Sequence, residues 1–334
     1  MPVMIASPTL SEIGTASVVR PSVTQKLFSI VVPTYCRPQE LRQLLEALAR
    51  VDFPRERFEV VIVNDGGPAG TGETVELFAG RLDVTLINAM RAGPANARNV
   101  GAHAARGEYL AFTDDDCMPA PDWLRKLEAH VIARPDAGIG GEIRNAFESD
   151  AFSTASQTLI QYLYEYYNVN CDEDSFFTTA NLTFPRALFL EMSGFDVTFP
   201  LAAAEDRDLC DRWRERGLHF HFAPDAVVRH AHSLNFSGFC RQHFNYGQGA
   251  VYLHRARDRR GREKPRFESL RFYRRLVFSP IGRGHGWSVP LLVTLMILSQ
   301  ATYGFGYYWA RFTTRSGDRP DLPAGRATGS AVAR

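Results

Sequence analysis

Strand-like and helix-like segments alternate regularly in the first third of the chain, and this pattern constrains the fold more than any other feature. The strand-like segments are continuous apolar runs, as expected of strands that are buried on both faces. They cover residues 28–33, 58–63, 84–87 and 108–113, and helices are predicted between them over 38–50, 73–78 and 95–105. The alternation predicts an α/β fold with a doubly wound, mostly parallel sheet that is flanked by helices.

Polar side chains follow three of these four predicted strands. Thr34 follows the first strand, Asp65 follows the second, and three carboxylates at 114–116 follow the fourth. In open α/β sheets, ligands bind outside the carboxyl ends of the strands. The sequence therefore predicts a ligand site at this edge of the sheet. No G-x-G-x-x-G or G-x-x-x-x-G-K-[ST] motif follows the first strand, which disfavours a dinucleotide fingerprint and a P-loop.

The three consecutive carboxylates allow two interpretations. In the first, they form a solvated acidic turn in which Asp116 caps a helix that begins near Pro121. In the second, they hold a hard cation such as Mg²⁺ or Mn²⁺, which prefers carboxylates and often bridges to substrate phosphates. The polar ends of the neighbouring strands favour the second interpretation.

The second half of the chain is less regular. We expect helices over 156–167, 185–192, 205–216 and 236–252, and strands over 176–184 and 227–232. Two histidines, His230 and His232, fall on one face of the last strand because side chains alternate along a strand. Lone histidines are more often structural than ligands, so their position alone decides nothing.

Five sequence stretches, taken together and in order, resemble the family 2 glycosyltransferases. They are FSIVVPTYCRP, VVIVNDGG, GPANARNVGAHAARGEYLAFTDDD, GFD and AEDRDLCDRW, and the resemblance covers residues 28–232. It implies an inverting enzyme with the GT-A fold. Such an enzyme moves a sugar from a nucleoside-diphosphate sugar donor to a hydroxyl acceptor, here a cell-envelope glycan or a lipid-linked molecule, with Mn²⁺ or Mg²⁺ as cofactor.

The resemblance also implies a role for individual residues in donor and metal binding. Thr34 and Asp65 match positions that hold the nucleotide base, and Arg98 matches a residue that lines the diphosphate pocket. Residues 114–116 stand at the family's D-x-D position. There Asp114 and Asp116 approach the metal, and Asp115 faces the ribose or the sugar, so that Asp114 and Asp115 also count among the donor-binding residues.

For the transfer step, the resemblance makes Asp206 the general base and His230 a third metal ligand, with His232 as the alternative ligand. A base is needed because the attacking hydroxyl must lose its proton, and the metal offsets the charge that develops on the leaving diphosphate. Without the family match, Asp65 could be a turn residue and Arg98 a surface residue. Glu205 and Asp206 could equally be charges that suit a helix N-terminus.

Two positions depart from the family pattern and concern the acceptor side. Val197 stands where an acidic residue usually follows G-F-D, and Ala204 stands where a glycine usually precedes E-D. Neither change removes a reacting group, but both can reshape the loop at which the acceptor binds.

Four regions are predicted along the chain. They are a disordered leader (1–26), a nucleotide-sugar-binding half (27–117), an acceptor-binding and catalytic-base half of the same domain (118–250), and a basic and apolar helical C-terminal region (251–334). The net charge of +1 gives no support for a nucleic-acid partner. The five cysteines include no C-x-x-C pair, which favours a reducing, cytoplasmic location.

The C-terminal region contains two features that point to a membrane. Residues 251–280 hold ten Arg and Lys against three Asp and Glu, and residues 289–309 contain no charged side chain. An anionic bilayer attracts basic segments, and the apolar stretch is long enough to span a bilayer or to lie on it. We therefore expect the protein at the inner face of the cell membrane, held peripherally or by a C-terminal anchor. The alternative is a core helix that packs on the catalytic domain.

Two rival functions remain to be weighed against a glycosyltransferase. A nucleotidyltransferase on a related sheet would be expected to have a glycine-rich phosphate loop near the first strand, and VVPTYCRPQEL has none. A non-catalytic sugar-nucleotide-binding protein would not need Asp114, Asp116 and Asp206 together.

Overall fold

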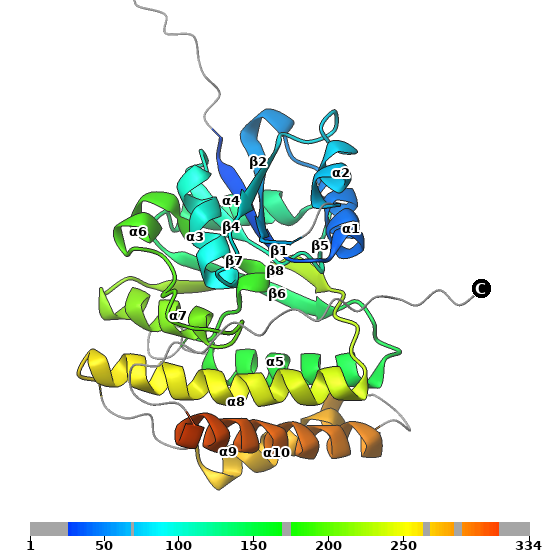
Figure 1. The fold of residues 1–334 in the computed structure, drawn as a ribbon, viewed down its shortest axis with the longest axis vertical. Helices are drawn as coiled ribbons and strands as arrows, with labels where there is room; N and C mark the ends of the chain where they lie inside the picture. Colours follow the sequence, from blue (N-terminus) through cyan, green and yellow to red (C-terminus); the bar gives the residue numbers. More distant parts are fainter. Residues whose placement is uncertain (1–25, 68–69, 169–174, 263–267, 284–288, 314–334) are drawn as a thin grey trace, which may run out of the picture.

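An eight-stranded mixed sheet forms the centre of the protein (Figure 1). The structure, a computed structural model, describes residues 26–67, 70–168, 175–262, 268–283 and 289–313, so the predicted leader lies almost entirely outside it. The strand order is β3-β2-β1-β4-β7-β6-β8-β5. The strands are β1 (Phe28–Thr34), β2 (Phe58–Asp65), β3 (Val84–Ala89), β4 (Tyr109–Phe112), β5 (Cys117–Pro119), β6 (Gly138–Asn145), β7 (Leu182–Pro185) and β8 (Phe220–His230).

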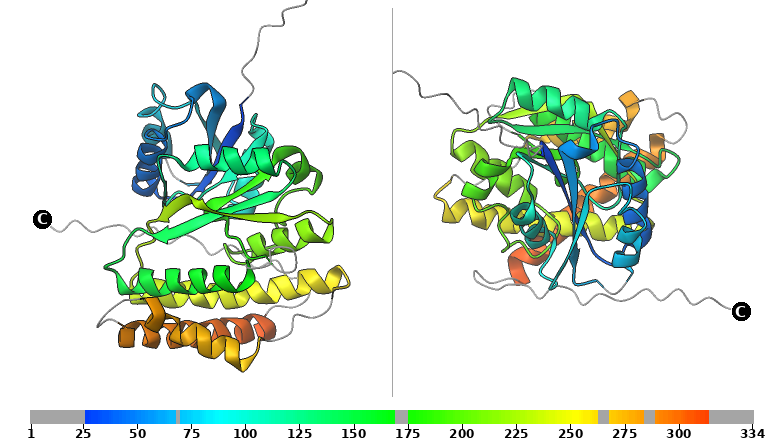
Figure 2. Two further views of the ribbon diagram at one scale, coloured as in Figure 1. Left: turned by 180° about the vertical axis from the view of Figure 1, so that it is seen from behind. Right: turned by 90° about the horizontal axis from the view of Figure 1, so that it is seen from above.

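Helices cover both faces of this sheet and form a further layer beyond it (Figures 1 and 2). They are α1 (Pro38–Leu48), α2 (Thr71–Glu76), α3 (Pro94–Ala104), α4 (Trp123–Ala133), α5 (Ala151–Tyr167), α6 (Arg186–Glu191), α7 (Glu205–Glu215), α8 (Phe236–Arg259), α9 (Leu270–Phe278) and α10 (Val289–Thr313). Three short 3₁₀ segments, Arg55–Arg57, Thr179–Asn181 and Ser279–Arg283, complete the described secondary structure.

The N-terminal half confirms the predicted fold class. Strands β3, β2, β1 and β4 are neighbours and run parallel, with Val31 of β1 opposite Val61 of β2. Helix α1 begins with a proline at its first turn and buries Leu41 and Leu45 against the sheet, as its leucine spacing predicts. On the other side, α3 approaches β1 so closely that a Cβ at Gly101 would lie 2.5 Å from Cγ1 of Val31.

The C-terminal half of the sheet is where the sequence prediction is wrong in detail. Strand β7 pairs antiparallel with β4 and β6, while β8 pairs parallel with β6 and antiparallel with β5. The prediction missed β5 and β6, and only the end of the segment 176–184 is a strand. The missed strand β6 is glycine-rich because it needs room: a Cβ at Gly140 would lie 2.0 Å from the Phe177 ring, and one at Gly141 would lie 2.2 Å from the Asn181 amide.

Helices α5, α8, α9 and α10 form a layer below the sheet, which we call the helical layer (Figure 2). Helix α8 runs across position 250, where a regional boundary was expected, and α9 was not predicted as a helix. Backbone contacts hold α10 against α8, since a Cβ at Gly247 would lie 2.0 Å from the Tyr303 carbonyl oxygen and one at Gly306 would lie 2.0 Å from that of Phe244. By length and composition, α10 is the one helix in the described chain that is able to cross a membrane.

Candidate active site

Two cavities meet below the carboxyl ends of the parallel strands. The first, which we call the upper pocket, has a volume of about 720 Å³ and is lined by Thr34, Asp65 and the three consecutive aspartates. The second, which we call the lower cavity, has a volume of about 1340 Å³ and extends from Asp114 and Asp206 into the helical layer. Both are lined by Arg98, Asp114, Ala202, His230, His232, Gln242 and Tyr246.

The three consecutive aspartates lie in three different environments. The Asp115 carboxylate accepts hydrogen bonds from Oγ1 of Thr34 at 2.8 Å and from Nη1 of Arg37 at 3.1 Å. The same Arg37 nitrogen lies 3.0 Å from Oδ2 of Asp116. Asp114 is more exposed than the other two and pairs with Arg98. None of the three caps α4, which begins after Asp122, so the structure does not bear out the capping interpretation of Asp116.

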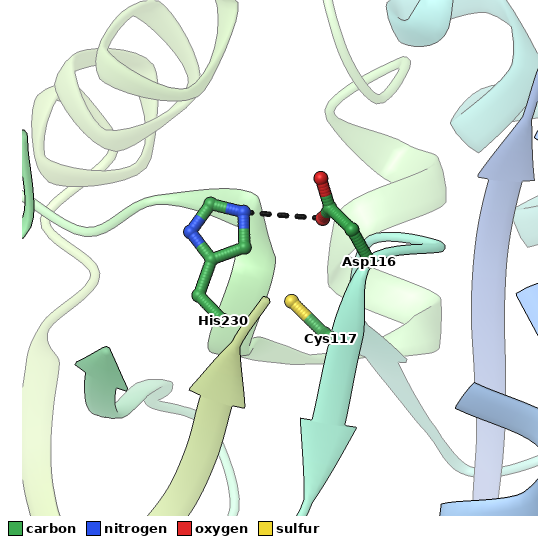
Figure 3. A group of neighbouring side chains, drawn as sticks. All are labelled: Asp116, Cys117 and His230. Carbon is green, nitrogen blue, oxygen red and sulfur yellow. Dashed lines mark hydrogen bonds and ion pairs between the residues drawn. The ribbon is translucent and has the colours of Figure 1, made fainter. Parts of the chain in front are cut away.

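Asp116 and His230 are brought together by strand pairing. Asp116 directly precedes β5, and His230 ends β8, where it lies opposite Cys117 in the antiparallel register. Nε2 of His230 is 3.1 Å from Oδ1 of Asp116, and Figure 3 shows the imidazole turned toward this carboxylate beside the Cys117 thiol. The His232 ring lies farther along, with its centroid 5.1 Å from that of His230.

These residues fit a divalent cation. The nearest ligand atoms of Asp116, Cys117 and His230 lie within 4.8 Å of one another. Burial raises the pKa of the Cys117 thiol well above its usual value, so the sulfur stays protonated and is not a suitable ligand for a hard cation. The Asp116 carboxylate and the His230 imidazole are the ligands that remain, with Asp114 nearby on the shared wall of the two cavities.

The protonation of the aspartates differs because their partners differ. Burial raises the pKa of Asp115 to about 6, although Arg37 opposes this. Burial acts in the same direction on Asp116, but His230 and Arg37 outweigh it and hold the pKa of that carboxyl well below its usual range. Burial lowers the pKa of the His230 imidazole, but the Asp116 charge outweighs this effect and raises it. In the resting state, Asp116 is therefore ionised, and it lies beside an imidazole whose basicity is raised.

Arg98 links Asp114 to Glu205, which directly precedes Asp206. Its side chain is 4% exposed; Nη2 donates to Oδ1 of Asp114 at 2.7 Å, and Nη1 donates to Oε1 of Glu205 at 3.0 Å. Because one guanidinium holds both groups, Asp114 and Glu205 keep a fixed relative position. Arg98 was predicted to line a diphosphate pocket, and it does line the upper pocket, with two of its nitrogens already bound to carboxylates.

Asp65 is positioned by the loop that precedes α3. Its two carboxylate oxygens accept the backbone N–H groups of Ala92 at 2.8 Å and Gly93 at 2.9 Å. Each carboxylate oxygen has a second lone pair, so a further donor can still bind. Asp65 lines the upper pocket together with Thr34, and the predicted contact of both residues with a nucleotide base stays a prediction.

Asp206 lies at the start of α7, on the wall of the lower cavity. The helix begins after Ala204, which adopts the left-handed conformation at φ 73° in place of the family's usual glycine. Oδ1 of Asp206 accepts the backbone N–H of Arg207 at 2.8 Å. Burial raises the pKa of Asp206, and burial together with Asp206 raises that of Glu205 to about 7. A carboxylate with a raised pKa is a stronger proton acceptor than an ordinary one.

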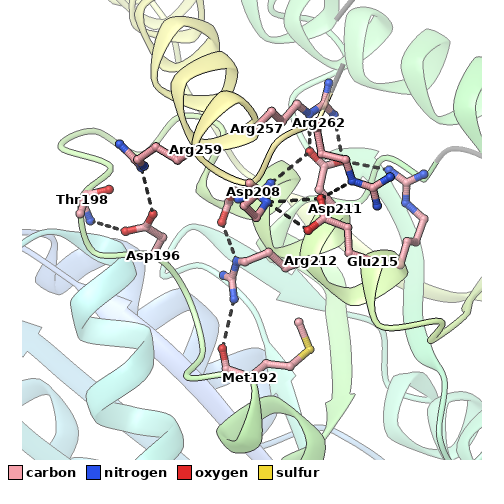
Figure 4. Close-up of polar contacts among 12 residues, drawn as sticks. Met192, Asp196, Thr198, Asp208, Asp211, Arg212, Glu215, Arg257, Arg259 and Arg262 are labelled. Carbon is pink, nitrogen blue, oxygen red and sulfur yellow. Dashed lines mark hydrogen bonds and ion pairs between the residues drawn. The ribbon is translucent and has the colours of Figure 1, made fainter. Parts of the chain in front are cut away.

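An ion-pair network fixes α7 on the C-terminal end of α8 (Figure 4). The fully buried Asp208 binds Arg212 at 2.8 Å and Arg260 at 2.6 Å, and Asp211 binds Arg257 at 2.5 Å. Arg257 and Arg260 belong to the basic stretch that was expected to face a membrane. Part of that positive charge is therefore used inside the protein, where it holds the helix that carries Asp206.

Several residues of these cavities were missed by sequence reasoning. Arg37 contacts two of the three aspartates, and Glu205 binds Arg98. Helix α8 adds Arg241, Gln242 and Tyr246 to the upper pocket. Arg37 follows the first strand closely and could have been found as a cation near the carboxylates, but nothing in the sequence of α8 indicates that this helix returns to the site.

Asn181, in the 3₁₀ segment before β7, links several elements of the fold. It is fully buried, its Oδ1 accepts the Trp123 indole N–H at 3.0 Å, and its amide donates to the carbonyls of Glu142 and Ala226. Its hydrogen bonds tie β6, β8 and α4 together, so this side chain has a structural role.

Known proteins resemble this chain in sequence. The family model for "Glycosyl transferase family 2" matches residues 29–192. The chain carries a glycosyltransferase family 2 domain over these residues. It is 25% identical over 234 residues to glycosyltransferase AglE of Haloferax volcanii, a match that covers 69% of this chain and 75% of AglE. A match of 26% identity to the pre-mycofactocin glycosyltransferase of Mycobacterium tuberculosis covers 67% of this chain and 47% of that protein.

Solved structures show that this glycosyltransferase has a GT-A-like fold. The mannosyltransferase PcManGT from Pyrobaculum calidifontis, solved in complex with GDP-Man and Mn²⁺, superposes with a TM-score of 0.56 at 22% identity, covering 89% of this chain and 84% of PcManGT. TarS (residues 1–349) of Staphylococcus aureus superposes with a TM-score of 0.53 at 18% identity, covering 85% of this chain and 91% of that structure. At these sequence identities, the structural likeness shows the fold alone.

Proposed function

We propose that this glycosyltransferase is a metal-dependent, inverting enzyme that transfers a sugar from a nucleoside-diphosphate sugar to a hydroxyl acceptor. One observation carries the proposal: the Asp116–His230 pair and the Asp206 carboxylate lie on two cavities that meet at Asp114 and Arg98. The upper pocket would take the donor, and the lower cavity would take the acceptor. In this assignment, residues 27–117 remain the donor-binding half, and α8 contributes to the walls of both cavities.

The donor side of the proposal rests on the ligands around Asp116. Asp116 and His230 would hold Mn²⁺ or Mg²⁺, with Asp114 on the side of the donor phosphates. A divalent cation there supplies Lewis-acid stabilisation of the negative charge on the leaving diphosphate. PcManGT binds GDP-Man with Mn²⁺, and a TarS structure contains UDP-GlcNAc, which supports a nucleotide-sugar donor without deciding its base or sugar.

The acceptor side rests on Asp206. One of its oxygens accepts a backbone N–H, and no group in the described part of the chain binds the other. That oxygen would accept the proton of the attacking hydroxyl, which lies across the donor carbon from the departing diphosphate, so that the anomeric centre is inverted. Arg98 and Glu205 would act as positioning residues, because they tie the start of α7 to Asp114.

A membrane location at the cytoplasmic face is part of the same proposal. Exposed aromatic side chains gather toward the end of α10, with Phe305 62%, Trp309 51% and Phe312 81% exposed. Arg271 and Arg274 of α9 are exposed beside this helix. Because α10 is bound to α8 through glycine contacts, it would lie on the bilayer with one face in the headgroup region and would not cross it.

Hydrolysis of nucleotide sugars tests the proposed chemistry. In a panel of UDP- and GDP-sugars with Mn²⁺, the wild-type protein should hydrolyse at least one donor, and excess EDTA should abolish the reaction. Asp116→Ala should be inactive at every metal concentration, because the metal would lose its main ligand. Full activity in EDTA, or in Asp116→Ala, would contradict the metal-dependent mechanism.

A further inference from the structure

The lower cavity is longer than a hydroxyl acceptor site needs to be. It begins at Asp114 and Asp206, continues between α5 and α8, and reaches α9 and α10. Its volume of about 1340 Å³ exceeds the 300–1000 Å³ that is typical of small-molecule sites. Tyr308 lines it and is 55% exposed, so the cavity extends from the candidate base to the outer surface of the helical layer.

The chemistry of the lining changes along this cavity. Near Asp206 the walls are polar and include Arg98, Thr178 and His230. Farther down, many lining side chains are aliphatic or aromatic, among them Ile160, Leu163, Val251, Phe272, Leu276 and Tyr303, while Glu268, Gln300 and Arg311 add polar groups to this part of the wall. An apolar wall of this kind favours a hydrocarbon segment, because each methylene that leaves water gains free energy.

The far end of the cavity adjoins the apolar outer face of the protein. On α10, Tyr308 belongs to the cavity lining, while Trp309 and Phe312 stand exposed on the same part of the helix. A chain that leaves the cavity here meets apolar side chains directly. The polar region near Asp206, the largely apolar middle of the cavity and the aromatic-rich exit, which Arg311 also lines, therefore form one continuous path.

From this path, and on the basis of the proposed function, we infer that the acceptor is an amphiphile. Its hydroxyl-bearing head would lie at Asp206, and its hydrocarbon chain would pass between α5 and α8 onto the outer face of α9 and α10. A lipid-linked acceptor in a membrane and a soluble alkyl-chain acceptor share this chemistry.

Two glycines of α10 allow the cavity to be tested by substitution. A Cβ at Gly306 would strike the Phe244 carbonyl oxygen, whereas a Cβ at Gly304 would meet nothing within 4 Å. Gly304 also lines the lower cavity. A larger side chain at 304 would therefore occupy the passage without a clash in the helix packing. Ala301 is exposed on the same helix and does not line the cavity, so Ala301→Leu is a matched control.

The test measures binding of n-alkyl glucosides, from butyl to dodecyl, below their micelle concentrations. In calorimetric titrations of the full chain, affinity should rise by up to about fourfold per methylene, which corresponds to about 0.8 kcal/mol. Gly304→Leu should weaken dodecyl glucoside binding at least tenfold and remove most of the dependence on chain length. Ala301→Leu should behave like the wild type. Leu163→Trp obstructs the cavity from α5 and serves as a second variant if Gly304→Leu folds poorly.

Three results would overturn the inference: affinity that does not rise with chain length, a rise that survives both obstructing variants, or an equal loss in Ala301→Leu. If the rise with chain length survives both obstructing variants, the alkyl chain binds only to the outer face of the helical layer. Donor hydrolysis is measured separately and needs no alkyl acceptor. Intact Mn²⁺-dependent hydrolysis with a failed chain-length test would therefore reject the amphiphile and leave the proposed function standing. To distinguish a lipid-linked acceptor in a membrane from a soluble alkyl-chain acceptor, transfer to liposome-embedded alkyl acceptors is compared with transfer to free ones.

Discussion

The upper pocket and the lower cavity meet at Asp114 and Arg98, but they are built in different ways. The ends of β1, β2 and β4, whose positions follow from a buried parallel sheet, form one wall of the upper pocket, and α8 with the segment that precedes it forms the other. The lower cavity is lined largely by α5 and by the consecutive helices α8, α9 and α10, which meet through side-chain and glycine contacts. The strand-end wall of the proposed donor side is thus fixed by local sequence and strand pairing, whereas the proposed acceptor side depends on tertiary packing.

This difference suggests how the two sides can vary independently. The strand ends that carry Thr34, Asp65 and the three aspartates leave little freedom, because a shift of register would bury polar groups or expose apolar ones. A change in α5, α8 or α10 alters the walls of the lower cavity without moving the sheet. We therefore expect a common donor chemistry to be combined with an acceptor preference that is set by the helical layer.

The largest expected effect separates proton acceptance at Asp206 from donor binding in the upper pocket. Asp206→Asn keeps the shape of the side chain but removes the proton acceptor, so turnover should fall by roughly 10²–10⁴-fold while donor affinity changes little. Steady-state kinetics with varied donor concentration measure both quantities. Turnover that survives at saturating donor, together with a collapsed donor affinity, would place Asp206 on the donor side and remove the distinction between the cavities.

A smaller effect tests whether glycine contacts hold the helical layer together. Gly306→Ala places a methyl group against the Phe244 carbonyl oxygen and should lower the free energy of unfolding by about 1–3 kcal/mol. Gly304→Ala, two residues away, meets no neighbour and should raise it by up to about 1 kcal/mol, because alanine favours the helix. Denaturant unfolding compares the two variants. If both are equally stable, α10 is not packed on α8 as described.

The smallest expected effect concerns the outer face of the helical layer. Arg274→Gln removes one exposed charge of α9 and should weaken binding to anionic liposomes by about fivefold at low salt, which corresponds to about 1 kcal/mol. Arg257→Gln removes a charge that is already paired with Asp211 and serves as the control. Co-sedimentation measures both. Equal losses in the two variants, or no binding by the wild type, would argue against a membrane-facing α9.

The same contrast explains what the sequence could predict. The parallel strands and α1 to α3 were predicted closely, because buried apolar runs and leucine spacing are local signals. The position of Asp116 next to His230 followed only from the family resemblance, since no local pattern shows that β5 pairs with β8. Strand β6 was missed because its glycines, which make room for Phe177 and Asn181, hide the apolar pattern of a strand.

The return of α8 to the site was not predictable for a related reason. Its Gln242 and Tyr246 lie more than a hundred residues from Asp114 in the chain, yet all three line both cavities. The basic stretch was taken as a membrane signal, but Arg257 and Arg260 bind acidic residues of α7. Charge counts cannot distinguish arginines that are paired inside a protein from those that face a membrane.

Calorimetric titration of UDP and GDP, with and without Mn²⁺, tests the division between the two cavities most directly. We predict that at least one of these nucleotides binds the wild-type protein only with Mn²⁺, that Asp116→Asn loses this binding, and that Asp206→Asn keeps it. Nucleotide binding that is equally strong without Mn²⁺, or that is lost in Asp206→Asn and kept in Asp116→Asn, would contradict this division.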